Sequence, residues 1–312
     1  MEVGNGSRIT EFILLGFKDV PELQMFLFAL FSVFFLITLG GNFTIVILVI
    51  TDPHLHIPMY FLLANLSFLD ICYSNVTVPK LLVNFLSEKT TISFQGCITQ
   101  LHFFHFFGST EAMILCAMSY DRYVAICNPL RYPILMNTKV CILLALSSWV
   151  IGFLYSMVHT ILTSRLPFCK YNTISNFYCD VKPLLKLACI NTQFNERLLN
   201  IVTGFIALSA FSLVMISYYH ISSSILKMHS INGREKAIST CASHLTVVCF
   251  YYETAICTYL RPTSEYFLEQ DRISAIFVTV FTPALNPIIY TLRNKEVQSS
   301  LRRTIITKTN FC

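Results

Sequence analysis

Seven long stretches without a charged side chain constrain this chain more than any other feature of its sequence. They lie between Glu22 and Asp52, Asp52 and Asp70, Lys89 and Glu111, Lys139 and Arg165, Arg197 and Lys227, Lys236 and Glu253, and Arg272 and Arg293. About 20 apolar residues cross the hydrocarbon core of a bilayer, and such a segment is helical because a helix bonds its own backbone. The stretches predict an all-α membrane protein with spans near 25–50, 58–82, 98–124, 140–163, 198–226, 237–260 and 273–292.

The low content of charged residues excludes most other classes of protein. Only 12% of the 312 residues are charged and 54% are hydrophobic, whereas about 25% of the residues in a soluble domain are charged. Disordered, collagen-like and coiled-coil chains are excluded, and a soluble enzyme with one core is not expected. No hydrolase triad, phosphate-binding loop or complete metal-ligand set is visible. We therefore expect no enzymatic activity, and we expect no nucleic-acid partner.

The tail and the loops indicate the orientation of the chain. Lys and Arg are divided evenly between the two sides, so the positive-inside rule does not decide. Residues 1–24 lack the apolar region of a cleavable signal and carry a glycosylation sequon at Asn5. Four cysteines lie on the same side as this tail, namely Cys97, Cys169, Cys179 and Cys189. They suit an oxidising exterior and allow three disulfide pairings, so we expect the tail to be extracellular.

Polar side chains inside the apolar spans form a second pattern. Asn42, Asp70, Glu111 and Asn286 lie in four different expected helices. Each is costly in lipid unless it is paired, so the four could converge on one hydrated network. Separate helix-to-helix hydrogen bonds, each worth about 0.6 kcal/mol, are the alternative. The residues alone leave both interpretations open.

The third span connects two ends of the expected bundle. Phe104 and Arg122 are 18 residues apart, which is about 27 Å of helical rise, and Gly108 and Glu111 fall on the same stripe. One helix face thus joins an aromatic end, a buried acid and an arginine. Arg122 beside Asp121 also has a simpler interpretation, an interfacial ion pair at a helix end.

The carboxyl-terminal segment, residues 293–312, carries a pattern of its own. Val297, Leu301 and Ile305 repeat every four residues, and Arg302 and Arg303 lie alongside them. The repeat favours a short amphipathic helix on the inner membrane surface. A disordered basic tail is the alternative for so short a segment.

Several motifs together are typical of one family. They are LHIPMYFLL at 55–63, LSFLD at 66–70, AMSYDRYVAICNPLRY at 117–132, SY at 217–218, KAISTCASHLTVV at 236–248 and PALNPIIYTLRNKEV at 283–297. In this order they resemble the olfactory receptors, which belong to the rhodopsin-like G-protein-coupled receptors, and the resemblance covers essentially the whole chain. It implies a seven-helix bundle of the rhodopsin type with a short amphipathic eighth helix.

The resemblance also implies roles for residues of the motifs. The family arginine matched by Arg122 is released on activation to meet the G protein, and Asp121 would hold the resting state. The implied coupling and switch residues are Asp121, Arg122, Tyr123, Tyr218, Asn286, Pro287 and Tyr290. A sodium ion at Asp70 and Glu111 is implied as an allosteric ligand. For the disulfides, the resemblance implies Cys97 with Cys179 and Cys169 with Cys189, with Cys97 and Cys189 as the alternative pair.

The implied ligand cavity lies between the outer halves of the third, fifth, sixth and seventh spans. Its expected lining is Phe104, His105, Gly108, Ser109, Ala112, Val202, Thr203, Ile206, Tyr252, Ala255, Ile256, Tyr259, Ile276 and Thr279. This lining suits a small, volatile, weakly polar molecule. Glu253 departs from the family, which usually has glycine there. It could tune ligand choice or the helix-six switch, or it could be a protonated acid bonded to a neighbouring helix.

The resemblance implies an odorant receptor in the plasma membrane, expected in the cilia of olfactory neurons. It would be surrounded by lipid and would activate a stimulatory olfactory-type G protein to raise cAMP. A non-olfactory sensor of small metabolites is the alternative with the same fold. A transporter is the alternative of a different class, but the chain shows no repeated half.

Overall fold

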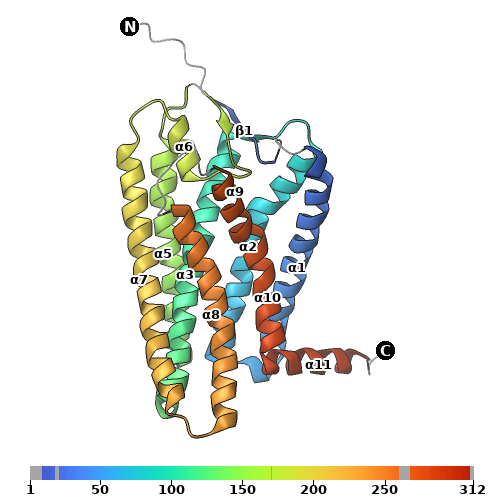
Figure 1. The fold of residues 1–312 in the computed structure, drawn as a ribbon, viewed down its shortest axis with the longest axis vertical. Helices are drawn as coiled ribbons and strands as arrows, with labels where there is room; N and C mark the ends of the chain where they lie inside the picture. Colours follow the sequence, from blue (N-terminus) through green and yellow to red (C-terminus); the bar gives the residue numbers. More distant parts are fainter. Residues whose placement is uncertain (1–8, 18–20, 170, 260–267, 310–312) are drawn as a thin grey trace.

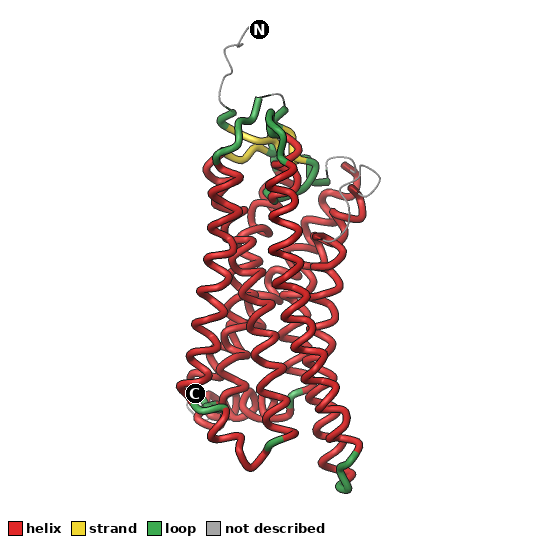
Figure 2. The backbone as a smooth tube through the Cα atoms, turned by 90° about the vertical axis from the view of Figure 1, so that its left-hand side faces the viewer, coloured by secondary structure: helices red, strands yellow, loops and turns green. Residues whose placement is uncertain are grey.

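The computed structural model describes residues 9–17, 21–169, 171–259 and 268–309. In these residues, seven long helical rods run side by side (Figures 1 and 2). Six are the helices α1 (Gln24–Thr51), α2 (Pro58–Leu86), α3 (Phe94–Cys127), α5 (Thr138–Ser164), α7 (Gln193–Leu226) and α8 (Ile231–Tyr259). The seventh joins α9 (Leu268–Ile276), the π-helical turn η5 (Phe277–Phe281) and α10 (Thr282–Arg293). The predicted seven-helix bundle is confirmed.

Shorter elements connect the rods and cover the ends of the bundle. They are the turns η1 (Pro21–Leu23), η2 (Pro53–Leu55) and η3 (Pro129–Arg131), the helices α4 (Tyr132–Leu135), α6 (Val181–Leu187) and α11 (Lys295–Thr309), and the strands β1 (Glu11–Leu14), β2 (Thr91–Ser93) and β3 (Thr173–Ile174). The helix α11 lies across the end of the bundle away from the strands (Figure 1). Val297 is buried and Leu301 half-buried on α11, whereas Arg302 and Arg303 are exposed. The predicted amphipathic helix therefore forms; the side chain of Ile305 lies outside the described residues.

The sides of the bundle are apolar. Among the described residues, five helical stretches are long and apolar enough to cross a membrane, namely Pro21–Thr51, Pro58–Leu86, Thr138–Ser164, Gln193–Leu226 and Arg272–Thr291. The helices α3 and α8, with 34 and 29 residues, are also long enough to cross a membrane. Large apolar side chains point outward, among them Leu36 on α1, Leu146 on α5 and Phe205 on α7. Lipid is the solvent that such a surface fits.

Most helices begin or end beyond the apolar spans that the sequence predicts. The helix α3 begins at Phe94, and the Ser93 hydroxyl caps it by accepting a hydrogen bond from the Gly96 amide at 3.1 Å. The helix α5 is capped by Asn137, which accepts from the Val140 amide at 3.0 Å. Because helices continue into capped polar turns, the absence of charge marks the membrane span and not the helix end.

A small sheet covers the end of the bundle opposite α11 (Figure 2). The strand β1 pairs with β2 in antiparallel and with β3 in parallel orientation, so the amino-terminal tail lies between two loops. Phe12 and Leu14 of β1 are fully buried, packed in one cluster with Phe168. Neither the sheet nor the burial of this tail was expected from the sequence.

Candidate functional site

A cavity opens inside the bundle toward the end that carries the sheet. Its walls come from α2, α3, α5, α7, α8, the seventh rod and the loop after α5. The lining consists of Tyr73, Phe104, His105, Gly108, Ser109, Ala112, Tyr155, Tyr178, Thr203, Ile206, Ala207, Tyr251, Tyr252, Ala255, Ala275 and Val278. The surface is mostly apolar with several phenols, which is the composition of a site for a small organic molecule.

Nine of the fourteen residues expected in the lining are found there: Phe104, His105, Gly108, Ser109, Ala112, Thr203, Ile206, Tyr252 and Ala255. Val202 is on α7 but outside the described lining. The side chains of Ile256 and Tyr259 lie outside the described residues.

The seventh rod presents neighbouring residues in place of the expected ones. Ala275 and Val278 line the cavity, whereas Thr279 is buried and donates its hydroxyl proton to the Ala275 carbonyl at 2.8 Å, and Ile276 packs against the core. The turn η5 is π-helical and holds one extra residue. A register counted along a regular helix from Asn286 is therefore displaced by one position before this turn.

Four tyrosines of the lining were missed by the sequence analysis: Tyr73, Tyr155, Tyr178 and Tyr251. The sequence did contain an indication that Tyr178 is near the cavity. Tyr178 precedes Cys179, and the Cys97–Cys179 disulfide holds this loop against α3. Tyr73 follows Asp70 by less than one helical turn on α2. A lining counted on only four helices cannot include it.

A buried polar pair fixes the loop that covers the cavity. His105 Nε2 lies 2.9 Å from Asp180 Oδ1, and both side chains are at most 5% exposed. Asp180 also accepts a hydrogen bond from the Val181 amide at 2.7 Å and so caps α6. The Cys179 amide donates to the Gln100 side-chain oxygen at 2.9 Å. The loop is thus attached to α3 by a disulfide and two polar contacts.

His102 bonds within the bundle. Its Nδ1 lies 3.1 Å from Thr160 Oγ1 and 3.3 Å from Ser156 Oγ, both on α5. Among the described residues, no three side chains of the metal-ligating types gather in one place.

The polar residues of the spans are only partly connected. The Asn286 side-chain amide donates to both oxygens of Asp70, at 3.0 and 3.1 Å. Asn42 donates to the Pro283 carbonyl at 3.0 Å and so reaches the same rod. Glu111 interacts with Asp70 electrostatically, but its Oε1 is buried without a hydrogen-bond partner. Asp70 and Asn286 are joined directly, and direct bonds do not link all four.

The α11 end of α3 carries the implied switch residues. Tyr132 donates its hydroxyl to Asp121 Oδ1 at 2.8 Å. Within the described residues, Asp121 and Arg122 form no ion pair, and Arg122 Nε is buried without a partner. Arg122 does lie close enough to Tyr218 and Tyr290 to interact with both electrostatically.

Comparisons with known proteins identify the family. A model of the olfactory receptor family matches residues 31–308. Human olfactory receptor 12D1 is 54% identical over 96% of this chain and 94% of its own length. Human olfactory receptor 12D2 is 53% identical over 96% of this chain and 98% of its own length. Mouse olfactory receptor 5G9 is 46% identical over 96% of this chain and 96% of its own length. The chain belongs to the olfactory receptor family. It is therefore a multi-pass membrane receptor and not an enzyme.

The disulfides of the receptor have the pairing that the resemblance implied. Cys97 is bonded to Cys179, and Cys169 to Cys189. The sequon at Asn5 lies outside the described residues.

Glu253 of the receptor faces away from the cavity. It is exposed on α8, whereas Tyr252 beside it is 1% exposed and donates to the Ala112 carbonyl. Successive residues of a helix are turned by about 100°, so the two side chains point to different sides. The structure thus gives no support to a direct contact between Glu253 and a ligand.

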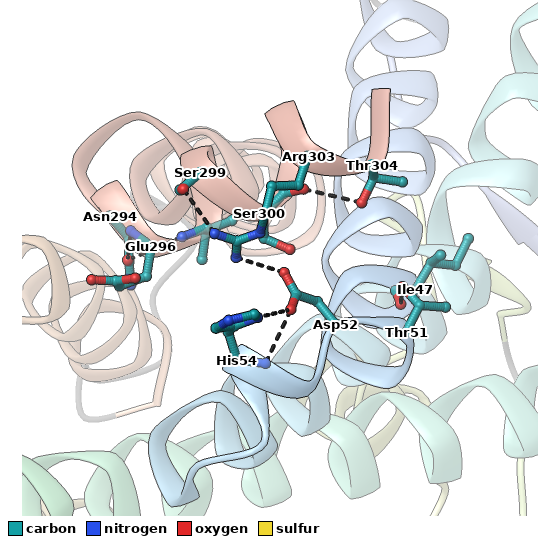
Figure 3. A network of polar contacts seen from close by, with 11 residues as sticks. Ile47, Thr51, Asp52, His54, Asn294, Glu296, Ser299, Ser300, Arg303 and Thr304 are labelled. Carbon is teal, nitrogen blue, oxygen red and sulfur yellow. Dashed lines mark hydrogen bonds and ion pairs between the residues drawn. The ribbon is translucent and has the colours of Figure 1, made fainter. Parts of the chain in front are cut away.

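A polar junction attaches α11 to the turn between α1 and α2 (Figure 3). Arg303 Nη2 lies 2.7 Å from Asp52 Oδ2, and the His54 amide and ring nitrogen lie 3.0 and 2.8 Å from Asp52 Oδ1. The Ser300 hydroxyl beside it, together with the Arg303 guanidinium, holds the pKa of the Asp52 carboxyl well below its usual range. The receptor is braced here at the end where the switch residues lie.

Proposed function

We propose that this receptor binds small, volatile, weakly polar odorants in the cavity and activates a stimulatory olfactory-type G protein, which raises cAMP. The observation that carries the proposal is the course of α3. Its outer half supplies Phe104, Gly108 and Ala112 to the cavity wall, and its other end carries Asp121 and Arg122. One rigid helix therefore connects the ligand with the G-protein side.

The disulfides support one orientation of the chain in the membrane. Both disulfides join residues close in sequence to the strands β2 and β3 and to α6, at the end of the bundle that carries the sheet, and disulfides persist in oxidising compartments. In this proposal the sheet end is extracellular, Asn5 is glycosylated, and α11 lies on the cytoplasmic surface. The receptor then resides in the plasma membrane, in the cilia of olfactory neurons.

Contacts of α8 suggest how a ligand signals. Tyr251 donates its hydroxyl to the Gly108 carbonyl, and Tyr252 donates to the Ala112 carbonyl at 3.3 Å, so both phenols join α8 to α3 in the cavity wall. Further along α8, His244 Nδ1 lies 2.8 Å from the Tyr218 hydroxyl of α7. A ligand that displaces Tyr251 or Tyr252 shifts α8 against both neighbours and opens a cleft near Arg122.

A sodium ion near Asp70 and Glu111 completes the proposal. Glu111 Oε1, Asn42 Oδ1 and the Tyr290 hydroxyl are buried without hydrogen-bond partners, and unpaired oxygens suit a hard cation. The ion would offset the charge of two buried carboxylates and favour the resting arrangement. Thermal unfolding of purified receptor tests this: sodium chloride should raise the melting temperature relative to choline chloride, and Asp70→Asn should abolish the difference. An equal effect of sodium on the melting temperatures of both proteins would show that sodium does not bind at Asp70.

The coupling assignment is tested in cells that carry the receptor, a trafficking chaperone and a cAMP reporter. Arg122→Ala should abolish the response to every activating odorant at unchanged surface level. Arg131→Ala is the matched control, because Arg131 is exposed in η3 and should leave most of the response intact. Full signalling by Arg122→Ala would show that coupling does not depend on this residue.

A further inference from the structure

The phenol of Tyr73 stands in the cavity wall without a hydrogen-bond partner. Its side chain is 2% exposed and lines the cavity from α2, yet it makes no hydrogen bond to any other described residue. The Tyr73 oxygen is not completely enclosed by protein atoms, so it faces the cavity space. A buried donor with no partner is unfavourable unless something in the cavity accepts its proton.

The neighbouring polar groups are already engaged. Tyr155 and Thr203 share a hydrogen bond of 2.7 Å, and Ser109 donates to the His105 carbonyl at 2.7 Å. Tyr251 and Tyr252 donate their protons to backbone carbonyls of α3. Ser109, Tyr251 and Tyr252 have no proton left for a ligand, and the Tyr155–Thr203 pair keeps one proton on a hydroxyl that already has a partner. Tyr73 differs from all of them because its hydroxyl has no hydrogen-bond partner among the described residues.

The charges near the cavity are also engaged with each other. His105 and Asp180 lie 2.9 Å apart and are almost completely buried. A charged ligand would enter a mostly apolar cavity without a free counter-charge among the described lining residues, and an unpaired charge is far costlier there than an unpaired hydroxyl. The lining therefore favours a neutral ligand.

The space beside the Tyr73 hydroxyl is shaped by a glycine. The rings of Tyr73 and Phe104 lie 5.0 Å apart, which fixes the phenol against α3. A Cβ atom at Gly108 would lie 3.9 Å from the Tyr73 oxygen and 3.4 Å from the edge of its ring. Because glycine has no such atom, room for one ligand atom remains next to the hydroxyl.

We propose that Tyr73 is the residue that selects the ligands of this receptor, by donating a hydrogen bond to the acceptor oxygen of a neutral ketone, aldehyde or ester. The inference rests on the proposed function, because it names the ligand class of the same cavity. A phenol donates its proton well and accepts poorly, since its oxygen lone pair is delocalised into the ring. Tyr73 therefore distinguishes a carbonyl compound from a hydrocarbon of the same shape.

The test is a cAMP concentration–response screen with matched pairs of volatile compounds. Each aliphatic or aromatic ketone, aldehyde or ester is paired with the hydrocarbon of similar shape, as acetophenone is with ethylbenzene; volatile amines and carboxylic acids complete the panel. In the wild-type receptor, the carbonyl member should be about tenfold or more potent than its hydrocarbon partner. Tyr73→Phe, which keeps the ring against Phe104, should remove that ratio.

Tyr60→Phe is the matched control, since Tyr60 is another buried tyrosine of α2 that donates its hydroxyl to Asn294 Oδ1 at 3.1 Å and is not part of the described cavity lining. It should shift both members of a pair equally and leave the ratio unchanged. A loss of folding alone also shifts both members together, so the ratio separates a specific role of Tyr73 from a structural one. Surface level is measured for each variant.

The outcomes separate this inference from the proposed function. Equal potency within the pairs, a ratio that survives in Tyr73→Phe, or activation confined to amines or acids would overturn the role of Tyr73 and leave an odorant receptor. If the wild-type receptor reaches the cell surface and responds to no member of the panel, the proposed function fails with it. If Tyr73→Phe does not reach the surface, Gly108→Ala replaces it, because the added Cβ would lie 3.9 Å from the Tyr73 oxygen and fill the space for the acceptor atom. This variant should lower the ratio, and an unchanged ratio would overturn the role of Tyr73.

Discussion

Asn42 donates its side-chain amide to the Pro283 carbonyl at 3.0 Å. Pro287 lies four residues after Pro283 and has no amide proton, so this carbonyl lacks its partner inside α10. A polar residue of the first helix thus satisfies the acceptor that a proline of the seventh rod leaves open. The bond locates the loosened part of that rod next to α1.

Asn42→Ala should therefore destabilise the receptor by about 1–3 kcal/mol, because it leaves a buried carbonyl unpaired. Thr44→Ala is the control, since Thr44 is exposed and bonds only to the Gly40 carbonyl of its own helix. Thermal unfolding of purified receptor measures both. If Thr44→Ala lost as much stability as Asn42→Ala, the role assigned to the bond between Asn42 and the Pro283 carbonyl would be contradicted.

Two adjacent glycines of α1 should respond differently to alanine. A Cβ at Gly41 would lie 2.8 Å from two atoms of the Pro287 ring, whereas a Cβ at Gly40 would meet nothing within 4 Å. Gly41→Ala should separate α1 from α10 and lower surface expression. Gly40→Ala should be neutral or stabilise by up to about 1 kcal/mol through helix propensity. Equal expression of the two variants would show that α1 and α10 are not packed this closely.

The Asp52–Arg303 contact should stabilise α11 in a manner that depends on pH and salt. Because the pKa of Asp52 is lowered by folding, the contribution is present above the ordinary carboxyl pKa of about 4 and is lost as pH falls below it. Arg303 is 43% exposed, so we expect about 1 kcal/mol or less, reduced further by salt. A double-mutant cycle with Asp52→Asn and Arg303→Gln measures it, and additive effects would argue against the contact.

Glu253→Gln should leave the rank order of odorants unchanged, because Glu253 is on the exposed face of α8. Glutamine keeps the size of the side chain and removes only the charge. The cAMP concentration–response curves for the activating odorants provide the measurement. A reordering of potencies would mean that this acid acts on the cavity from outside.

The sequence predicts the helices well because an uncompensated charge in lipid is costly, so gaps between charges mark the spans directly. It also places most of the α3 lining, since α3 is a continuous helix anchored by the motif at Arg122. The π-helical turn η5 escapes such counting, because one extra residue rotates Ala275 into the place expected for Ile276. The pairing of β1 depends on contacts between distant loops, which local pattern does not encode.

The central claim, that ligands act from the cavity, is tested most directly on two neighbouring residues of α7. Ile206 lines the cavity, and Leu208 is 53% exposed on the outside of the same helix. The measurement is the cAMP concentration–response of Ile206→Phe and Leu208→Phe to every activating odorant, at matched surface level. The account predicts that Ile206→Phe shifts potencies by about tenfold or more, differently for each odorant, and that Leu208→Phe leaves them unchanged. Unchanged potencies in Ile206→Phe, or the same shifts in both variants, would contradict it.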